Sequence, residues 1–184
     1  MKTFLVIILA GATAALTIVV RVPIPGTGGY LNFGDIAVVF CGLFLGKKMG
    51  PLAGGLGSAL ADIIGGFFIF APITLVAKGL EGFIAGLVSE KRFSRIPVHT
   101  VFPGRGEKKS IKEVRINLIT VVFLIGAGFT MVVVYFTAEL FLPGVGFGAA
   151  VSEVPFNIIQ AASGAVGGYF VFIAVIKALP SERT

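Results

Sequence analysis

The sequence has no tryptophan, one cysteine, one histidine and few charged residues. The single cysteine, Cys41, excludes an internal disulfide. The single histidine, His99, lies in the longest polar stretch, so neither a Ser-His-Asp nor a Cys-His catalytic set can be assembled around it. A phosphate-binding GxxxxGKS or GxxxxGKT loop is also missing. We therefore expect a protein that is not an enzyme and has no cofactor or metal of its own.

Charge is scarce because apolar runs dominate the chain. Hydrophobic residues make up 56% and charged residues 13% of the 184 positions, against about 25% charged residues in a soluble domain. The runs are apolar on all sides, which indicates helices solvated by lipid. The first run also fits a signal peptide, but its apolar core is long for one and no polar processing segment follows. We predict an all-α integral membrane protein.

Six apolar segments follow one another in a single domain that covers residues 1–184. Their approximate ranges are 3–20, 35–46, 50–65, 72–90, 115–138 and 153–177. A helix that crosses ~30 Å of hydrocarbon needs ~20 residues, so the second and third segments are short. The basic turn GKKMGP at 46–51 separates them and suits an antiparallel helical hairpin. We predict a bundle of six transmembrane helices.

Lysine and arginine set the predicted orientation. If the N-terminus is cytoplasmic, then Lys47, Lys48, Lys177 and the basic loop 91–115 all face the cytoplasm, and Arg21 lies outside. Both termini are therefore predicted to be cytoplasmic, in the cell membrane. The basic loop could also bind nucleic acid or anionic lipid, but orienting the chain is the favoured role, and no nucleic-acid partner is expected.

The segment Pro23–Asp35 (PIPGTGGYLNFGD) contains two prolines and four glycines and has no hydrophobic periodicity. These residues shape a loop rather than continue a helix. The predicted topology places the loop outside the membrane, beside two further loops at 65–71 and 139–152. We expect the segment 23–35 to act as an extracellular lid over a small molecule.

Several ionisable residues fall inside the apolar segments, where charges are costly and are candidates for function. Asp35 follows Gly34 and can cap the second helix or face a ligand. Asp62 lies near the C-terminal end of the third segment, where the helix dipole disfavours a carboxylate. It therefore needs a cation or a hydrogen-bond donor as a partner. Lys78 and Glu81 share a helix face at membrane depth. They form either an internal ion pair, joined by Asp62, or the floor of a polar pocket.

The last segment carries Glu153, Asn157 and Gln160 at spacings that place three polar side chains on one helix stripe. The stripe either faces a ligand or binds a neighbouring helix. Aromatic rings in the outer loops either sandwich a flat heterocycle or anchor the chain at the interface. The predicted binding residues are Tyr30, Asn32, Asp35, Asp62, Phe67, Phe70, Lys78, Glu81, Glu153, Asn157 and Gln160.

The first segment carries small residues at a spacing typical of close helix packing. Ala10 and Ala14 form an AxxxA motif, and Gly11 and Ala15 repeat the spacing one residue on. This surface serves either packing within the chain or docking of a partner helix.

Taken together, these motifs resemble the substrate-binding (S) components of energy-coupling factor (ECF) vitamin transporters. The pieces are the AxxxA motif, GYLNFGD at 29–35, the glycine-rich 46–62 segment, APITLVAKGLEG at 71–82 and EVPFNIIQ at 153–160. The subgroup most similar is the riboflavin-transporter-like one, which also includes proteins assigned to pyridoxine or hydroxymethylpyrimidine.

The resemblance implies a subunit that binds a small vitamin from outside the cell with high affinity. It implies docking of the face with Ala10 and Ala14 on a transmembrane coupling protein, and ATP hydrolysis by two ATPase subunits. An alternative is a self-contained proton-coupled carrier that uses Asp62, Lys78 and Glu81. The sequence shows no inverted repeat of the kind found in many such carriers.

Overall fold

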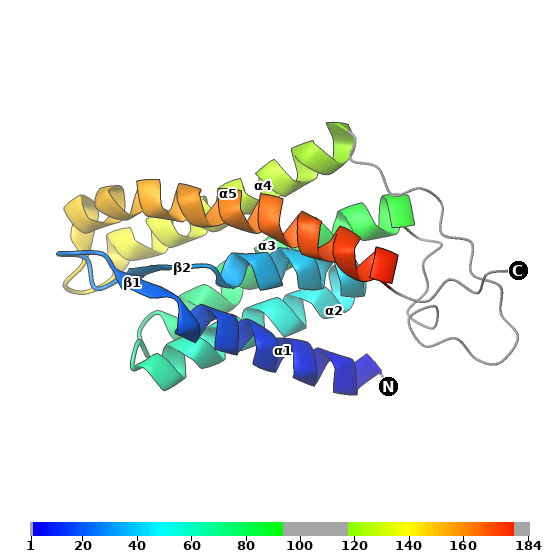
Figure 1. The fold of residues 1–184 in the computed structure, drawn as a ribbon. Coiled ribbons are helices and arrows are strands. Elements are labelled where there is room, and N and C mark those ends of the chain that lie inside the picture. Colours follow the sequence, from blue (N-terminus) through cyan, green and yellow to red (C-terminus); the bar gives the residue numbers. More distant parts are fainter. Residues whose placement is uncertain (1, 94–117, 179–184) are drawn as a thin grey trace, which may run out of the picture.

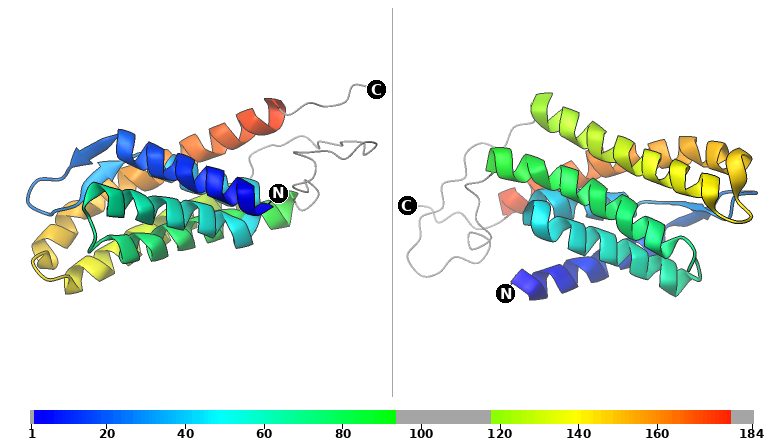
Figure 2. Two further views of the ribbon diagram at one scale, coloured as in Figure 1. Left: turned by 90° about the horizontal axis from the view of Figure 1, so that it is seen from below. Right: turned by 180° about the vertical axis from the view of Figure 1, so that it is seen from behind.

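The computed structural model describes residues 2–93 and 118–178. Its elements are α1 (Lys2–Val19), β1 (Arg21–Pro23), β2 (Tyr30–Asn32), α2 (Gly34–Gly65), α3 (Ala71–Phe93), α4 (Leu118–Phe141) and α5 (Gly146–Ala178). Figures 1 and 2 show the β1–β2 hairpin at the same end of the bundle as the α2–α3 and α4–α5 turns. We call this the hairpin end. The start of α1 and the end of α5 lie at the opposite end.

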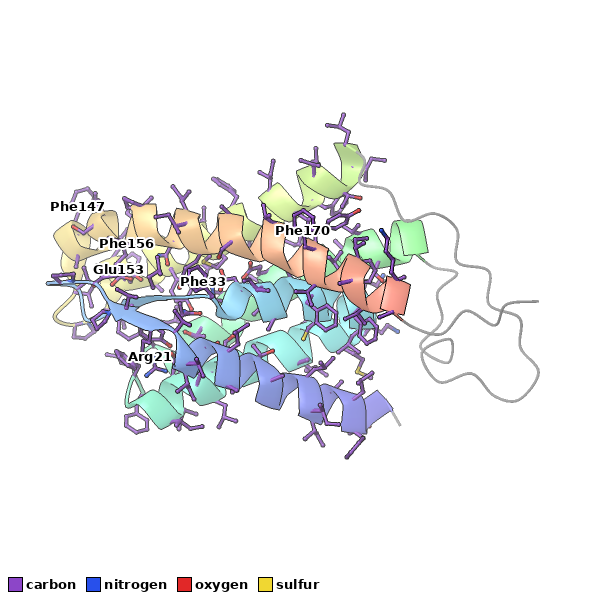
Figure 3. All side chains as sticks on the ribbon, viewed as in Figure 1. Arg21, Phe33, Phe147, Glu153, Phe156 and Phe170 are labelled. Carbon is purple, nitrogen blue, oxygen red and sulfur yellow. The ribbon has the colours of Figure 1, made fainter. Side chains whose placement is uncertain are left out.

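Four of the described helices, namely α2, α3, α4 and α5, are long and apolar enough to cross a membrane, and α1 is a shorter apolar helix. Large apolar side chains project outward from the bundle (Figure 3). Phe147 and Phe170 on α5, for example, are 70% and 68% exposed. An apolar outer surface is what a lipid environment requires, so the prediction of an all-helical membrane protein is confirmed.

The predicted helices 35–46 and 50–65 are the two arms of α2, which bends back on itself at Gly46, so the predicted helical hairpin is present within this one element. The arms meet at Gly46, whose φ of 77° and ψ of 178° are not helical. Only glycine adopts this conformation without strain. A Cβ on Gly50 would lie 2.6 Å from the Cα of Gly42, and one on Gly54 would lie 3.2 Å from the Cα of Val38, so the arms pack antiparallel. The basic loop 91–115 falls largely outside the described residues, and its first residues belong to α3.

The prediction of an outer loop at 139–152 is wrong. In the structure α4 continues to Phe141 and α5 already begins at Gly146, so only a short turn separates them. The sequence prediction started the last helix at residue 153, seven residues after the observed start of α5. The structure carries Pro155 inside α5.

The predicted lid is also more regular than a loop. Its ends pair as antiparallel strands, with Arg21 opposite Asn32 and Pro23 opposite Tyr30. The turn between them closes through a hydrogen bond from the Ile24 amide to the Gly29 carbonyl, 3.0 Å long.

An apolar core fills the half of the bundle away from the hairpin end. Its members come from α2, α3, α4 and α5: Val39, Leu43, Ala85, Val88, Leu124, Phe172 and Ile176. These helices leave the opposite half, under the hairpin, to polar side chains.

Candidate functional site

A cavity lies under the hairpin, between the hairpin-end halves of the helices. It is lined by Thr17, Gly29, Tyr30, Asn32, Ser58, Asp62, Phe70, Thr74, Lys78, Tyr135, Glu153, Asn157 and Gln160. The empty space totals about 420 Å³ when its open mouth is included, within the ~300–1,000 Å³ typical of small-molecule sites. The enclosed space that water molecules could occupy is much smaller, about 30 Å³, which is room for about two waters. A ring-sized ligand therefore requires the hairpin or the lining side chains to move.

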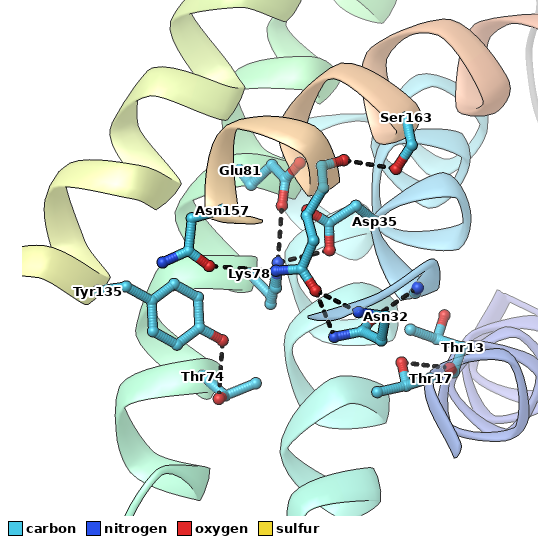
Figure 4. Close-up of polar contacts among 12 residues, drawn as sticks. Thr13, Thr17, Asn32, Asp35, Thr74, Lys78, Glu81, Tyr135, Asn157 and Ser163 are labelled. Carbon is cyan, nitrogen blue, oxygen red and sulfur yellow. Dashed lines mark hydrogen bonds and ion pairs between the residues drawn. The ribbon is translucent and has the colours of Figure 1, made fainter. Parts of the chain in front are cut away.

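Lys78 forms the buried cationic centre of the site (Figure 4). Its Nζ lies 2.5 Å from Oδ1 of Asp35 and 3.8 Å from Oε2 of Glu81. Asp35 therefore contacts Lys78 and does not cap α2, whose N-cap residue, Phe33, makes no side-chain cap hydrogen bond. Glu81 lies behind Lys78 and does not line the cavity. Of the two readings of Lys78 and Glu81, the internal ion pair is present, with Asp35 as its closer member.

Asn32 and Gln160 connect the hairpin to α5. The Gln160 Oε1 accepts hydrogen bonds from the backbone amide of Asn32 at 2.6 Å and from its Nδ2 at 2.8 Å. The Gln160 Nε2 donates to Oδ1 of Asn157 at 3.2 Å. This chain of bonds orients the Asn157 amide and leaves its Nδ2, which is buried, without a hydrogen-bond partner among the described residues. Of the three predicted polar residues of α5, Gln160 holds the hairpin, and Asn157 keeps a free donor at the cavity.

A second set of contacts holds the hairpin to the α2–α3 turn. The Tyr30 hydroxyl donates a hydrogen bond to Oδ1 of Asp62. The Arg21 guanidinium lies 4.4 Å from the Tyr30 ring centroid and 5.1 Å from that of Phe67, and it donates to the Ala61 carbonyl at 3.2 Å. Burial, and then the nearby Asp62 carboxyl group, raise the pKa of the Tyr30 hydroxyl above its usual value. Phe67 therefore packs on the hairpin and does not line the cavity.

Phe70 lines the cavity and is 9% exposed, whereas Phe68 is 67% exposed and faces away from the bundle. On the α3–α4 side the Tyr135 hydroxyl donates to Thr74 Oγ1 at 2.8 Å (Figure 4). The Lys78 ammonium lies 5.4 Å from the Tyr135 ring centroid. The cavity thus has aromatic walls on two sides.

Glu139 on α4 is fully buried, and its carboxyl group lies within hydrogen-bonding reach of that of Glu153 on α5. Neither Glu139 oxygen has a donor in the described part of the chain, and Oε1 of Glu153 has none either. Figure 3 shows Glu153 close to the hairpin. A Cβ at Gly29 of the hairpin would lie only 2.2 Å from Oε1 of Glu153, so the backbone there passes directly over the carboxyl group.

Three of the predicted binding residues, Asp35, Phe67 and Glu81, do not line the cavity, and the other eight do: Tyr30, Asn32, Asp62, Phe70, Lys78, Glu153, Asn157 and Gln160. The sequence reasoning missed other polar residues that line the cavity, namely Thr17, Ser58, Thr74 and Tyr135, and it missed Glu139 behind Glu153. A signal existed in the spacing, because several of them lie one helical turn from another polar residue. Ser58 precedes Asp62, Thr74 precedes Lys78, and Tyr135 precedes Glu139 by four positions.

On α1 the structure separates the two small-residue pairs. Ala14 is 5% exposed and packs in the bundle, whereas Ala10 is half-buried and its backbone carbonyl would lie 2.4 Å from a Cβ on Gly57 of α2. Gly11 and Ala15 are exposed on the other side of α1. Ala14 therefore packs within this chain, and docking of a partner at the AxxxA motif stays a prediction.

The fold and the cavity define a class: a multi-pass helical membrane protein with a buried polar cavity at one end. The family model for the S component of ECF-type riboflavin transporters matches residues 2–177. The chain therefore belongs to this family of substrate-binding subunits of vitamin transporters, as its motifs indicated.

Two curated proteins are similar to this chain in sequence. An uncharacterised protein from the gap 3′ region of Pyrococcus woesei is 37% identical over 159 residues, which cover 85% of this chain and 89% of that protein. The thiamine precursor transporter HmpT of Lactococcus lactis is 31% identical over 70 residues, which cover 38% of this chain and 42% of HmpT.

Proposed function

We propose that this protein captures a small vitamin or vitamin precursor from outside the cell in the cavity under the hairpin. Its ligand class is a ring of pyridoxine, hydroxymethylpyrimidine or riboflavin type. It then delivers the ligand through an ECF transmembrane coupling protein powered by two ATPase subunits. The site itself performs no chemistry on the ligand.

The observation that carries this proposal is the set of buried polar atoms at the cavity that lack partners. Asn157 Nδ2, Glu153 Oε1, Asp62 Oδ2 and Ser58 Oγ are all buried without a hydrogen bond among the described residues. Each such atom costs about 1–3 kcal/mol unless a partner satisfies it. A bound polar ring satisfies several of them at once, and the hairpin above closes the site.

The described charges support an orientation with the hairpin outside the cell. Lys47 and Lys48 follow the Gly46 turn, and Lys177 lies near the end of α5, all at the end of the bundle opposite the hairpin. Arg21 lies at the hairpin end. An excess of basic residues marks the cytoplasmic side, so the cavity faces outward.

The test is ligand recovery followed by thermal unfolding. The detergent-purified chain is denatured, and released small molecules are identified by mass spectrometry. Each B vitamin and its ring precursor is then added to the ligand-free protein. A true ligand at one hundred times its Kd stabilises the fold by about 2.7 kcal/mol, which raises the unfolding midpoint. The proposal fails if no small molecule is released and no member of the panel raises the midpoint.

The exposed side of α1 is the surface we propose for the coupling protein. Small residues there, Gly11 and Ala15, allow a partner helix to approach closely. Ala15→Trp is expected to abolish co-purification with the coupling protein and leave ligand affinity unchanged. Ala14→Trp is the matched comparison, because it inserts the same ring into the bundle and should lower the unfolding midpoint. Equal loss of assembly in two well-folded variants would contradict this division of the helix.

The proton-coupled carrier has less support from the contacts. It requires Asp62, Lys78 and Glu81 to act in series. Asp62 instead accepts a hydrogen bond from Tyr30, and Lys78 pairs with Asp35.

A further inference from the structure

We propose that Glu139 and Glu153 form a subsite for an amino, ammonium or amidinium group on the ligand ring. This inference rests on the proposed function and narrows the ligand class to rings that carry an amino, ammonium or amidinium group. The starting observation is two carboxyl groups from different helices that lie together, one of them fully buried, with no donor to the Glu139 oxygens in the described chain. Two such groups repel each other when ionised, so they need a proton or a cation between them.

The cations near the cavity are already engaged elsewhere. Lys78 contacts Asp35 at 2.5 Å and Glu81 at 3.8 Å. Arg21 packs between the Tyr30 and Phe67 rings and donates to the Ala61 carbonyl. Within residues 2–93 and 118–178 no ion pair joins a basic side chain to Glu139 or Glu153. Since no described basic side chain neutralises the pair, a donating group of the ligand can take the place of the proton that the two carboxyl groups otherwise share.

An independent observation points to a ligand at the same place. Asn157 lies one helical turn after Glu153, is 5% exposed and lines the cavity. Its Oδ1 is held by Gln160, so its unpartnered Nδ2 is the atom that remains for a ligand. Glu153 thus presents an acceptor and Asn157 a donor on adjacent turns. A ring nitrogen beside an amino group offers the complementary acceptor and donor.

The hairpin fixes where this group can sit. Gly29 passes over Glu153 so closely that a Cβ there would lie 2.2 Å from its Oε1. The carboxyl group is thus covered by backbone and directed to the cavity, which it lines. A ligand held between Glu153 and Asn157 lies beneath the closed hairpin.

The experiment measures Kd for two matched pairs and one larger neutral ring with the detergent-purified full chain. The pairs are pyridoxamine against pyridoxine, and 4-amino-5-hydroxymethyl-2-methylpyrimidine against its 4-oxo analogue. Riboflavin is the neutral ring. The tightest binder is expected to carry the amino group. Its Kd should be lower than that of its matched partner by about tenfold or more, because the partner lacks one charge-assisted hydrogen bond.

Variants locate the effect. Glu153→Gln keeps the shape of the side chain and should raise the Kd of the amino compound about tenfold. Glu139→Gln should raise it by a smaller factor. Ser152→Ala, on the adjacent exposed position, is the control and should leave Kd within about twofold. If either glutamine variant loses its ligand-free fold, the ranking within the matched pairs decides alone.

The outcomes separate the two proposals. Tight binding of riboflavin or of an oxygen analogue, unaffected by Glu153→Gln, overturns the nitrogen subsite and leaves the vitamin-binding function standing. Binding of none of the five compounds, together with no released vitamin, overturns both. A preference for the amino ligand that Glu153→Gln removes supports both.

Discussion

The two ends of the bundle use the same helices for different purposes. Toward the hairpin, α2, α3 and α5 contribute Asp35, Lys78 and Gln160, which are buried and polar. Toward the other end the same helices contribute Leu43, Val88 and Phe172, which pack into the apolar core. Among the described residues, the members of the apolar core have no unpaired buried polar side-chain atom, whereas the polar end keeps several. Function and fold are thus divided along each helix rather than between helices, and substitutions at the two ends should separate stability from binding.

The largest expected effect is structural and lies at the polar end. Lys78→Met leaves Asp35 and Glu81 buried without their cation, which costs roughly 3–5 kcal/mol of unfolding free energy. Chemical denaturation in detergent measures the loss. Adding Asp35→Asn removes one of the two unpaired acids and should restore part of the stability. Unchanged stability in Lys78→Met would show that this ion pair does not hold the polar end together.

The next effect lies in the apolar core. Phe172 is 2% exposed, so Phe172→Ala opens a cavity and should cost about 3 kcal/mol of unfolding free energy. The ligand Kd should stay within about twofold once the variant is folded, since the core and the cavity share no side chain and distant sites act independently. Phe170→Ala, on the exposed side of the same helix, is the control for stability. A tenfold change in Kd for Phe172→Ala would contradict the division between the two ends.

A moderate effect on binding alone is expected from Asn157→Ala. The free Nδ2 of this residue faces the cavity, so its removal should raise the ligand Kd about tenfold, or about 1.4 kcal/mol. Unfolding free energy should fall by less than about 1 kcal/mol, because only the bond from Gln160 is lost within the chain. Titration calorimetry and thermal unfolding measure the two values. Ile158→Ala, exposed on the next position, should change neither.

The smallest effect concerns the hairpin contact. Tyr30→Phe removes the hydrogen bond to Asp62 but keeps the ring beside Arg21, so it should cost about 1 kcal/mol. The folded pKa of Tyr30 is raised above its usual value of 10.0, so its contribution to stability is complete below that pH. It declines as the pH rises further, because the unfolded chain loses its proton first. The difference in unfolding midpoint between wild type and Tyr30→Phe should therefore stay constant from about pH 6 to 9 and narrow above about pH 10.

Much of this site was predictable because polar residues stand out in apolar helices. Glu153, Asn157 and Gln160 share a face by helical spacing alone, and the cavity confirms that they lie together. The partner of Lys78 was not predictable in the same way. Asp35 lies 43 positions away, and only the antiparallel packing of the arms of α2 against α3 brings it to Lys78.

Glu139 shows a second reason why sequence reasoning fell short. The sequence predicts that Glu139 lies in an outer loop, because the apolar run ends at residue 138. The structure continues α4 by one more turn and buries Glu139 completely. The apolar run in the sequence ends where the residues stop facing lipid. A helix whose last turn is buried against other parts of the protein can continue beyond that point with polar residues. The prolines and glycines of the hairpin predict a shaped segment. They do not predict the pairing of its two three-residue strands, because such short strands leave no hydrophobic pattern in the sequence.

The hairpin has almost no slack at either end. Only Val20 separates α1 from β1, and only Phe33 separates β2 from α2. A loop on long tethers opens within nanoseconds to microseconds, whereas a segment fused to helices moves with them, on a scale of microseconds to milliseconds. For the ligand that we propose, we therefore expect the residence time under this hairpin to depend on how often α1 shifts against α2. On the same basis, we expect a coupling protein bound to the exposed side of α1 to change the rate of ligand release without contacting the cavity.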